Sequence, residues 1–234
     1  LPIPGSIGEM KTKPTQYAAR TLNSAGLQAD IIIARAHEPL DQKRKQKIAT
    51  FCSVREDDVI SAPDVESIYE VPINFEKDKL SANILSRLRL RPKREDLKEW
   101  RAFVRNVHSA AEPVRIGIVG KYFGTGSYTL ADSYISVIEA LKHASYHLGR
   151  KPVIEWLNAE DLEGKRGAGD LERLAEFDGI VVPGGFGSRG VEGKISAIRF
   201  VRERKIPYLG LCYGMQLAVV EYARNVLVLT DAHT

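Results

Sequence analysis

The stretch Pro207-Tyr208-Leu209-Gly210-Leu211-Cys212-Tyr213-Gly214-Met215-Gln216 decides the fold of the second half of the chain. Its first residues are typical of a short apolar strand over 208–211, and a helix is expected from 215 onward. The turn between them has a cysteine at its apex and a glycine two positions away on either side. Small residues at those two places let the backbone bend sharply, so the sequence predicts a strand–turn–helix elbow that presents a nucleophile.

Cys212 is therefore predicted to be a reactive thiolate. The helix that follows directs its first N–H groups and the positive end of its dipole toward the sulfur, which favours the thiolate form. The alternative is a structural cysteine that ends a core strand, because free cysteine is among the most buried residue types. The flanking glycines and the strand–helix context favour the nucleophile.

The elements before the elbow alternate between strand and helix. Repeated strand-then-helix order is typical of a parallel, doubly wound sheet. Strands are expected over 114–120, 153–157 and 179–183, and helices over 132–148, 171–176 and 191–204. The third strand opens into the loop Gly184-Gly185-Phe186-Gly187-Ser188-Arg189-Gly190, whose backbone can approach a ligand closely.

A glycine-rich loop alone is often only a tight turn, but this one precedes the cysteine strand. The N–H groups of Gly185 and Tyr213 are expected to converge on the oxyanion of a tetrahedral adduct at Cys212. This arrangement predicts acyl transfer, in which a thiolate attacks an amide carbon. The base is expected outside this sequence, because none of the five histidines has a catalytic context. His143 and His147 suit a helix surface better than a metal site.

Composition argues against several classes of protein. The chain has 234 residues, 44% of them hydrophobic and 27% charged, which suits one large domain or two modest ones. Its two cysteines argue against a disulfide scaffold and fit a reducing, cytoplasmic setting. There is no apolar run of transmembrane length, no signal-peptide pattern, and only a mild net charge of +4. We therefore expect neither membrane nor nucleic-acid binding.

The first section of the chain begins with two lysines at the start of a helix. A helix is expected over 15–25 with Pro14 in its first turn, so Lys11 and Lys13 lie at its N-terminus. Cations at this end repel the helix dipole unless an anion binds there. Lys11 and Lys13 either form a site that binds phosphate or simply point into water, and the placement of their charges favours neither interpretation.

The rest of this section places further polar residues at strand ends. A strand over 29–34 is expected to be buried on both faces, with Arg35 at its carboxyl end, where parallel sheets bind ligands. The next helix, over 42–51 and capped by Asp41, carries Lys47 as its best candidate to reach a ligand. A second strand over 58–61 leads into the loop Pro63-Asp64-Val65.

A helix with one apolar side is expected over 79–88, with Leu80, Ile84 and Leu88 in register. A charge-rich break follows, and the apolar spacing over 97–108 suggests a docked linker helix. We expect three parts: a first domain over 1–97, a linker over 98–113 and a second domain over 114–234.

Several stretches, in order, resemble the CTP synthase family. Lys11-Thr12-Lys13-Pro14-Thr15-Gln16 resembles that family's lysine signature, and the cysteine elbow and glycine-rich loop resemble its class I glutamine amidotransferase domain. Other matching stretches lie at 64–69, 136–141 and 189–194, so the resemblance covers essentially the whole chain. It implies two incomplete parallel-sheet α/β domains: the end of a P-loop-type synthetase domain and the front half of a flavodoxin-like glutamine amidotransferase domain.

The resemblance also implies an activity. Such an enzyme is a ligase that uses ATP and Mg²⁺ to convert UTP to CTP with ammonia from L-glutamine. GTP as activator, CTP as inhibitor, and a homotetramer that can form filaments are implied as well. The Mg²⁺ ligands would lie outside this chain, in which no P-loop motif occurs. Another class I glutamine amidotransferase, or an inactive homologue that binds ligands or forms filaments, is the alternative.

Site residues follow from the resemblance position by position. Cys212 would be the nucleophile, and the histidine and glutamate that complete its triad would come after Thr234. Tyr213 stands where the family usually has leucine, which puts the shape of the glutamine pocket in question. The implied binding residues are Gly185, Tyr213, Gly214, Met215 and Gln216 for glutamine and its oxyanion; Lys11, Thr12, Lys13, Pro14, Thr15, Gln16, Lys47 and Phe51 for UTP or CTP; and Arg35, Pro63, Asp64 and Val65 for ATP.

Overall fold

The structure is a computed structural model that describes residues 1–5, 8–93, 96–120, 124–125, 128–129, 134–164, 168–185 and 187–234. The chain divides into two compact units, Leu1–Val104 and Arg105–Thr234, and each is described by itself. The division falls inside α5 (Lys98–Ser109), within the segment expected as a linker. Phe186 of the glycine-rich loop and the expected start of the helix from 132 lie outside the described residues.

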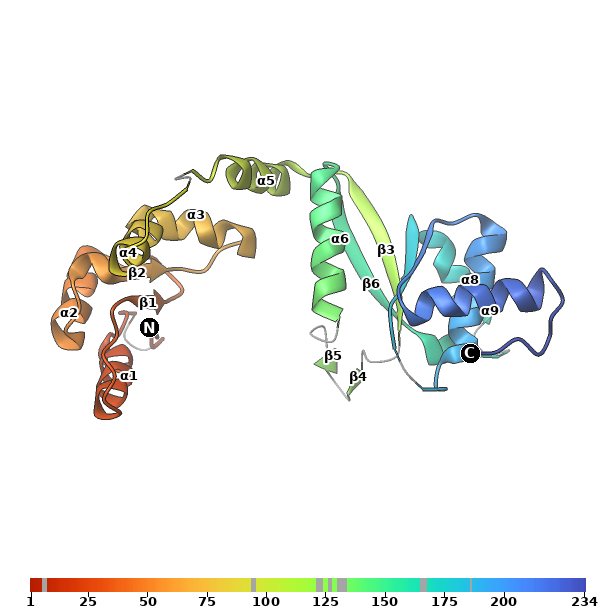
Figure 1. Ribbon diagram of the computed structural model, residues 1–234, viewed down its shortest axis with the longest axis horizontal. Coiled ribbons are helices and arrows are strands. Elements are labelled where there is room, and N and C mark those ends of the chain that lie inside the picture. The colour runs from red at the N-terminus through yellow and green to blue at the C-terminus, as the bar shows by residue number, and fades with distance from the viewer. Residues whose placement is uncertain are drawn as a thin grey trace. The chain divides into compact units, whose positions relative to one another are not determined.

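The described part of the first unit contains a two-stranded parallel sheet. β1 (Ile32–Arg35) pairs with β2 (Val59–Ala62), and Ile32 lies opposite Val59. The core beneath the sheet is built from Ile48, Cys52 and Val59 together with Met10. The helices of this unit, labelled in Figure 1, are α1 (Lys13–Ser24), α2 (Gln42–Cys52), α3 (Val71–Phe75) and α4 (Leu80–Arg87).

The local signals for α1 and α2 are confirmed. Pro14 lies in the first turn of α1, and Gly26, with a φ of +79°, follows its end. Asp41 caps α2 by accepting a hydrogen bond from the N–H of Arg44 at 2.7 Å. Both helices therefore begin and end close to where these residues predict.

One expectation for this unit was wrong, because β1 is not buried on both faces: Ile33 is 50% exposed. The helix expected over 79–88 is confirmed as α4, in which Leu80 is buried and Ile84 is 38% exposed. The short helix α3 was not predicted, since Pro72 in its first turn and a length of five residues leave little periodic signal.

The first turns of α5 dock on the first unit, as predicted. The indole N–H of Trp100 donates to the backbone carbonyl of Tyr69 at 2.8 Å. The rings of Tyr69 and Phe103 meet edge to face with centroids 5.1 Å apart, and Val104 is buried. The aromatic side chains thus fix this end of the helix.

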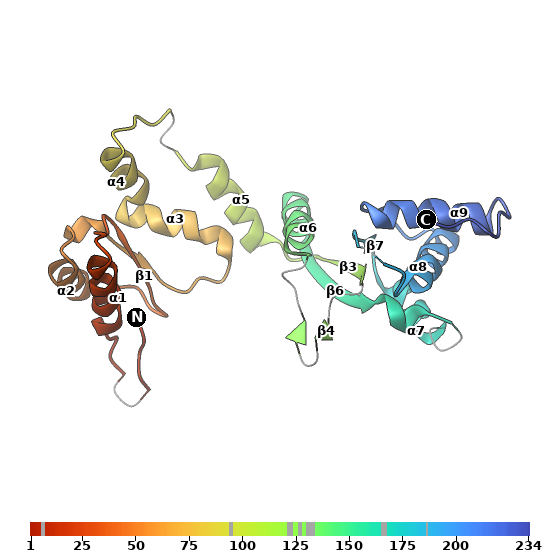
Figure 2. The same ribbon diagram turned by 60° about the horizontal axis from the view of Figure 1, so that its bottom comes forward.

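The described part of the second unit contains a four-stranded parallel sheet in the order β6–β3–β7–β8. This confirms the doubly wound α/β class. α6 covers one face of the sheet, and α8 and α9 cover the other (Figure 2). The elements are β3 (Pro113–Gly120), β4 (Gly124–Thr125), β5 (Tyr128–Thr129), α6 (Ile135–His147), β6 (Lys151–Asn158), α7 (Ala168–Glu172), β7 (Gly179–Val182), α8 (Val191–Arg204), β8 (Tyr208–Gly210) and α9 (Tyr213–Asn225).

The packing of α8 follows its sequence pattern. Ile195, Ile198 and Val201 are buried, as their spacing predicts, and they share a core with Val182 of β7 and Leu217 of α9. Because β7 and β8 are parallel neighbours, their carboxyl ends lie at the same edge of the sheet. That edge carries the glycine-rich loop after β7 and Cys212 after β8.

Candidate functional site

Cys212 lies in the tight turn that links β8 to α9. It is the N-cap of α9, with φ 51° and ψ −106°, a conformation that L-residues rarely adopt. Such a backbone costs about 1–3 kcal/mol and persists only where the surrounding structure fixes it. The side chain is exposed, so the sulfur is open to a ligand, in contrast to the structural alternative.

Two glycines make this turn possible because no side chain fits at either place. A Cβ on Gly210 would lie 2.7 Å from the backbone carbon of Gly214 and equally close to the N of Met215. A Cβ on Gly214 would lie 2.0 Å from the carbonyl oxygen of Val182 in β7. The glycine spacing in the sequence thus reflects close contact between the elbow and the sheet.

A third glycine borders the sulfur. A Cβ on Gly184, at the end of β7, would lie 3.5 Å from the Cβ of Cys212 and 3.9 Å from its Sγ. The cysteine therefore faces backbone on this side, where a substrate can approach. Gly185 follows directly in the same loop, which places its backbone at the edge of the sheet that bears the sulfur.

The backbone N–H groups of the elbow divide into engaged donors and candidate donors. The N–H of Gly214 donates to the carbonyl of Leu211 at 3.0 Å, and that of Gln216 donates to the carbonyl of Cys212 at 3.2 Å. These two N–H groups are therefore used by hydrogen bonds within the turn. The oxyanion role of the N–H groups of Tyr213 and Gly185 stays a prediction, and the Met215 side chain is 56% exposed.

Tyr213, the residue that follows Cys212, packs into the second unit. Its ring joins the core that contains Leu217, and the Nζ of Lys194 lies 5.7 Å from the ring centroid. Lys194 is 1% exposed. The Tyr213 hydroxyl lies 3.4 Å from the Oγ1 of Thr234. The Tyr213 side chain therefore helps to hold the start of α9 in place.

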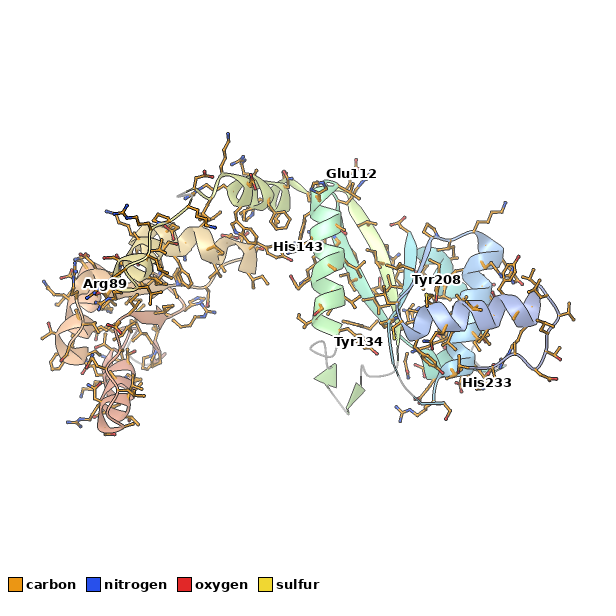
Figure 3. All side chains as sticks on the ribbon, in the orientation of Figure 1. Arg89, Glu112, Tyr134, His143, Tyr208 and His233 are labelled. Carbon is orange, nitrogen blue, oxygen red and sulfur yellow. The ribbon has the colours of Figure 1, made fainter. Side chains whose placement is uncertain are left out.

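The described residues show no hydrogen bond between Cys212 and a histidine. His143 lies on α6 and His233 near the C-terminal residue, as Figure 3 shows, and the Nδ1 of His233 is 2.9 Å from the carbonyl of Thr234. The expectation that the base lies outside this sequence stays a prediction.

In the first unit, the lysine signature surrounds one carboxylate. Lys11 pairs with Glu9 at 2.7 Å, and a guanidinium nitrogen of Arg44 lies 3.7 Å from the same carboxylate. The hydrogen bond from Lys11 lowers the pKa of Glu9, and the charges of Lys11, Arg44 and Lys47 add to this effect. The charges of Lys11 and Lys47, far apart in the sequence, thus both act on Glu9.

The other residues expected from the sequence to bind UTP or CTP differ in exposure. Thr12 is buried as the N-cap of α1, and its Oγ1 accepts a hydrogen bond from the Gln16 amide at 3.0 Å. Phe51, one turn after Lys47 on α2, is 63% exposed and available for stacking. Lys13, Pro14 and Thr15 form the first turn of α1.

Arg44 was not predicted from the sequence as part of this site. Its Nε donates to the carbonyl of Met10 at 3.3 Å, and its guanidinium also pairs with Asp41. It therefore ties the lysine signature to the start of α2. Among several basic residues on one helix, the sequence offers no signal that distinguishes it.

The residues expected near ATP meet at the carboxyl ends of β1 and β2. Arg35 pairs with Asp64 at 2.7 Å and also donates to the carbonyl of Ala62 at 3.3 Å. His37, which was not predicted, lies with its Nδ1 2.7 Å from the other oxygen of Asp64. Its position two residues after Arg35, at the same strand end, is a signal that would have found it. Pro63 and Val65 flank Asp64 in the same loop, both half-buried.

The His37–Asp64 contact shifts the pKa values of both side chains. The hydrogen bond and the charge of Asp64 raise the pKa of His37. The hydrogen bond from His37 and the charge of Arg35 lower the pKa of Asp64. The strand ends thus carry an imidazole and a guanidinium that share one carboxylate.

Two kinds of feature are absent from the described residues. In that part of the chain, no helix has both the length and the apolar character needed to cross a membrane. Nor, within the same ranges, do three or more His, Cys, Asp or Glu side chains gather in a group able to hold a metal ion.

The parallel sheet, the cysteine elbow and the glycine-bordered sulfur define a class I glutamine amidotransferase fold in the second unit. In agreement, residues 129–233 match the family model described as glutamine amidotransferase class-I. Residues 1–90 match the model described as CTP synthase N-terminus. The resemblance of this chain to the CTP synthase family is thereby confirmed.

Curated relatives extend the match across the chain. The CTP synthase of Nostoc punctiforme is 45% identical over 234 residues, which are 100% of this chain and 42% of the relative. That of Thermococcus gammatolerans is 50% identical over 228 residues, or 97% of this chain and 41% of the relative. The chain thus spans about two fifths of the length of these relatives.

A solved structure is also similar. The glutaminase domain of Trypanosoma brucei CTPS with bound acivicin is 42% identical, with a TM-score of 0.46. The match covers 50% of this chain and 43% of that chain.

Proposed function

We propose that this chain forms the central part of a glutamine-dependent CTP synthase. In this proposal the first unit contributes to the sites for UTP and ATP, and the second unit releases ammonia from glutamine. The observation that carries it is the exposed sulfur of Cys212, held on a strained elbow against Gly184, in a chain that also carries the lysine signature. A glutamine amidotransferase with another acceptor would have no use for that signature.

The glutaminase step is a double displacement at Cys212. The thiolate attacks the amide carbon of glutamine, and the resulting oxyanion receives hydrogen bonds from the N–H groups of Tyr213 and Gly185. The C–N bond breaks with proton transfer to nitrogen, which releases ammonia and leaves a thioester. Water then hydrolyses the thioester to glutamate and restores the thiol.

The amination step uses that ammonia. ATP transfers its terminal phosphoryl group to O4 of UTP, ammonia attacks C4, and phosphate leaves to give CTP. Lys11, Lys13 and Lys47 would bind the triphosphate of UTP or of inhibitory CTP, and Phe51 would contact the base. Thr12 would fix the loop before α1, where Pro14, Thr15 and Gln16 follow. Arg35 and the loop Pro63-Asp64-Val65 would contact ATP.

Mg²⁺ would supply charge neutralisation on the ATP phosphates. The described residues contain no cluster suited to the ion, so none of the roles assigned to this chain depends on it. GTP as an activator, a homotetramer, filaments and a cytoplasmic location belong to the same proposal and rest on the family resemblance.

The test replaces the nucleophile in a protein that also contains the regions found in the longer relatives. Cys212→Ala should abolish glutamine-dependent conversion of UTP to CTP, while conversion driven by added ammonia persists within about twofold. Cys52→Ala is the matched control, because Cys52 is buried in the core of the first unit. If Cys212→Ala retains glutamine-dependent synthesis, the assignment of the nucleophile is wrong.

A further inference from the structure

A tyrosine on the strand before the nucleophile contacts the helix after it. Tyr208 is the first residue of β8 and is labelled in Figure 3. Its hydroxyl donates a hydrogen bond of 2.7 Å to the backbone carbonyl of Gly214, in the first turn of α9. The ring packs against the core shared by α8 and α9, and burial raises the pKa of the phenol. The group therefore remains a hydrogen-bond donor throughout the neutral range.

The same glycine also packs closely on the neighbouring strand β7. The Cα of Gly214 approaches the backbone of Val182 so closely that a Cβ there would lie 2.0 Å from the Val182 carbonyl oxygen. The hydroxyl of Tyr208 also lies 2.7 Å from the place where a Cβ on Gly210 would be. The first turn of α9 is thus in contact with both β7 and the Tyr208 hydroxyl of β8.

These contacts bear directly on Cys212, two residues before Gly214. The cysteine is held at φ 51° and ψ −106°, and a strained backbone of this kind relaxes unless its neighbours prevent it. The hydrogen bonds within the turn, such as that from the N–H of Gly214 to Leu211, are local and move with it. The bond from Tyr208 instead anchors the turn to a strand of the sheet.

We propose that Tyr208 is a positioning residue for the nucleophile: its hydroxyl, acting through the Gly214 carbonyl, holds Cys212 in the conformation that exposes the sulfur. A purely structural role, in which the hydroxyl only satisfies a polar group at the edge of the core, would change stability and leave the reactivity of the thiol unaltered. The two roles therefore predict different reactivities of the Cys212 thiol.

The experiment compares Tyr208→Phe with the unaltered 234-residue chain. The second-order rate constant for alkylation of Cys212 by iodoacetamide is measured by peptide mass spectrometry. Tyr222→Phe is the matched control, because Tyr222 lies on α9 and is 49% exposed. Cys52, which is 1% exposed, serves as an internal reference that reports unfolding of the first unit, and the melting temperature followed through Trp156 reports unfolding of the second.

Loss of one net hydrogen bond, worth about 1 kcal/mol, predicts a roughly three- to tenfold lower rate constant at Cys212 in Tyr208→Phe. Tyr222→Phe should alkylate like the unaltered chain. Hydrogen exchange of the first turn of α9 should be faster in Tyr208→Phe alone. An equal alkylation rate constant in all three proteins, with or without a change in melting temperature, would overturn the proposal.

The positioning role rests on the proposed glutaminase function for its biological purpose, but alkylation of Cys212 requires neither glutamine nor UTP. If the chain served another reaction, the alkylation result would be unaffected. Conversely, an unchanged rate constant in Tyr208→Phe would leave the proposed function intact and exclude only the positioning role.

Discussion

At the scale of single residues, the site combines one residue with a strained backbone and two glycines that cannot be replaced by larger residues. Cys212 has a backbone conformation suited to glycine, and Gly210 and Gly214 have no space for a side chain. These features could be predicted from the sequence, because a cysteine between two small residues at a strand end is typical of a nucleophile elbow. His37 could have been found from its place at the same strand end as Arg35, whereas Arg44 could not be singled out, because its role depends on a contact with a residue distant in the sequence.

The pair of His37 and Asp64 predicts a specific pH dependence. The raised pKa of His37 means that the contact stabilises the folded state at low pH and is lost as the pH rises through that raised value. The lowered pKa of Asp64 means that the contact is also lost as the pH falls through that value. The pair therefore contributes only in the window between the two.

NMR titration of the His37 ring protons measures this effect. In Asp64→Asn the pKa of His37 should fall toward its ordinary value, because the hydrogen bond and the negative charge are both lost. Glu38→Gln is the control, since its charge makes a smaller contribution at His37. An unchanged titration in Asp64→Asn would show that the two side chains do not interact in solution.

At the scale of helices and strands, the contacts of an element with its neighbours decide whether its hydrophobic pattern correctly predicts its buried side. The spacing in α8 correctly predicts its buried side, because the helix packs on the sheet and beside α9. The same reasoning fails for β1, where Ile33 is 50% exposed among the described residues. A hydrophobic pattern identifies a face, whereas the burial of that face depends on which other elements are present.

The contact between α8 and α9 includes a buried charge. Glu221 is 1% exposed and accepts hydrogen bonds from Arg202 at 2.8–3.1 Å, and the amide of Asn225 also donates to it. Glu221→Gln removes the buried counter-charge and leaves the guanidinium only the more distant carboxylate of Glu203, at 3.6 Å. Since Arg202 is partly exposed, we expect a loss of about 1–3 kcal/mol of unfolding free energy.

Urea denaturation checks this prediction. Glu172→Gln is the control, because its pair with Arg204 is exposed on both sides and should contribute under about 1 kcal/mol. Equal midpoints for the two variants would mean that the buried pair contributes no more than a surface pair.

At the scale of the whole molecule, the two units have separate cores, one around Ile48 and Val59 and the other around Val182 and Leu217. Each unit also has its own tryptophan, Trp100 in α5 and Trp156 in β6. The division into two α/β parts could be predicted from the change in composition. Its location inside a continuous helix could not, because the first turns of α5 are fixed by contacts with Tyr69.

Single-tryptophan variants can test whether the units unfold separately. With Trp156 as the only tryptophan, Glu221→Gln should lower the urea midpoint by roughly 1 M, because about 1–3 kcal/mol is lost at a typical slope. With Trp100 as the only tryptophan, the same substitution should leave the midpoint unchanged. A common shift in both signals would show that the chain unfolds as one cooperative unit.

The positive φ of Cys212 has a consequence for how this protein can change. Glycine adopts that backbone freely, so Cys212→Gly should raise the melting temperature by a few degrees, a gain of about 1 kcal/mol, while destroying the nucleophile. Selection for thermal stability alone would therefore favour glycine at this position, whereas selection for a reactive thiol would favour cysteine despite its strained backbone.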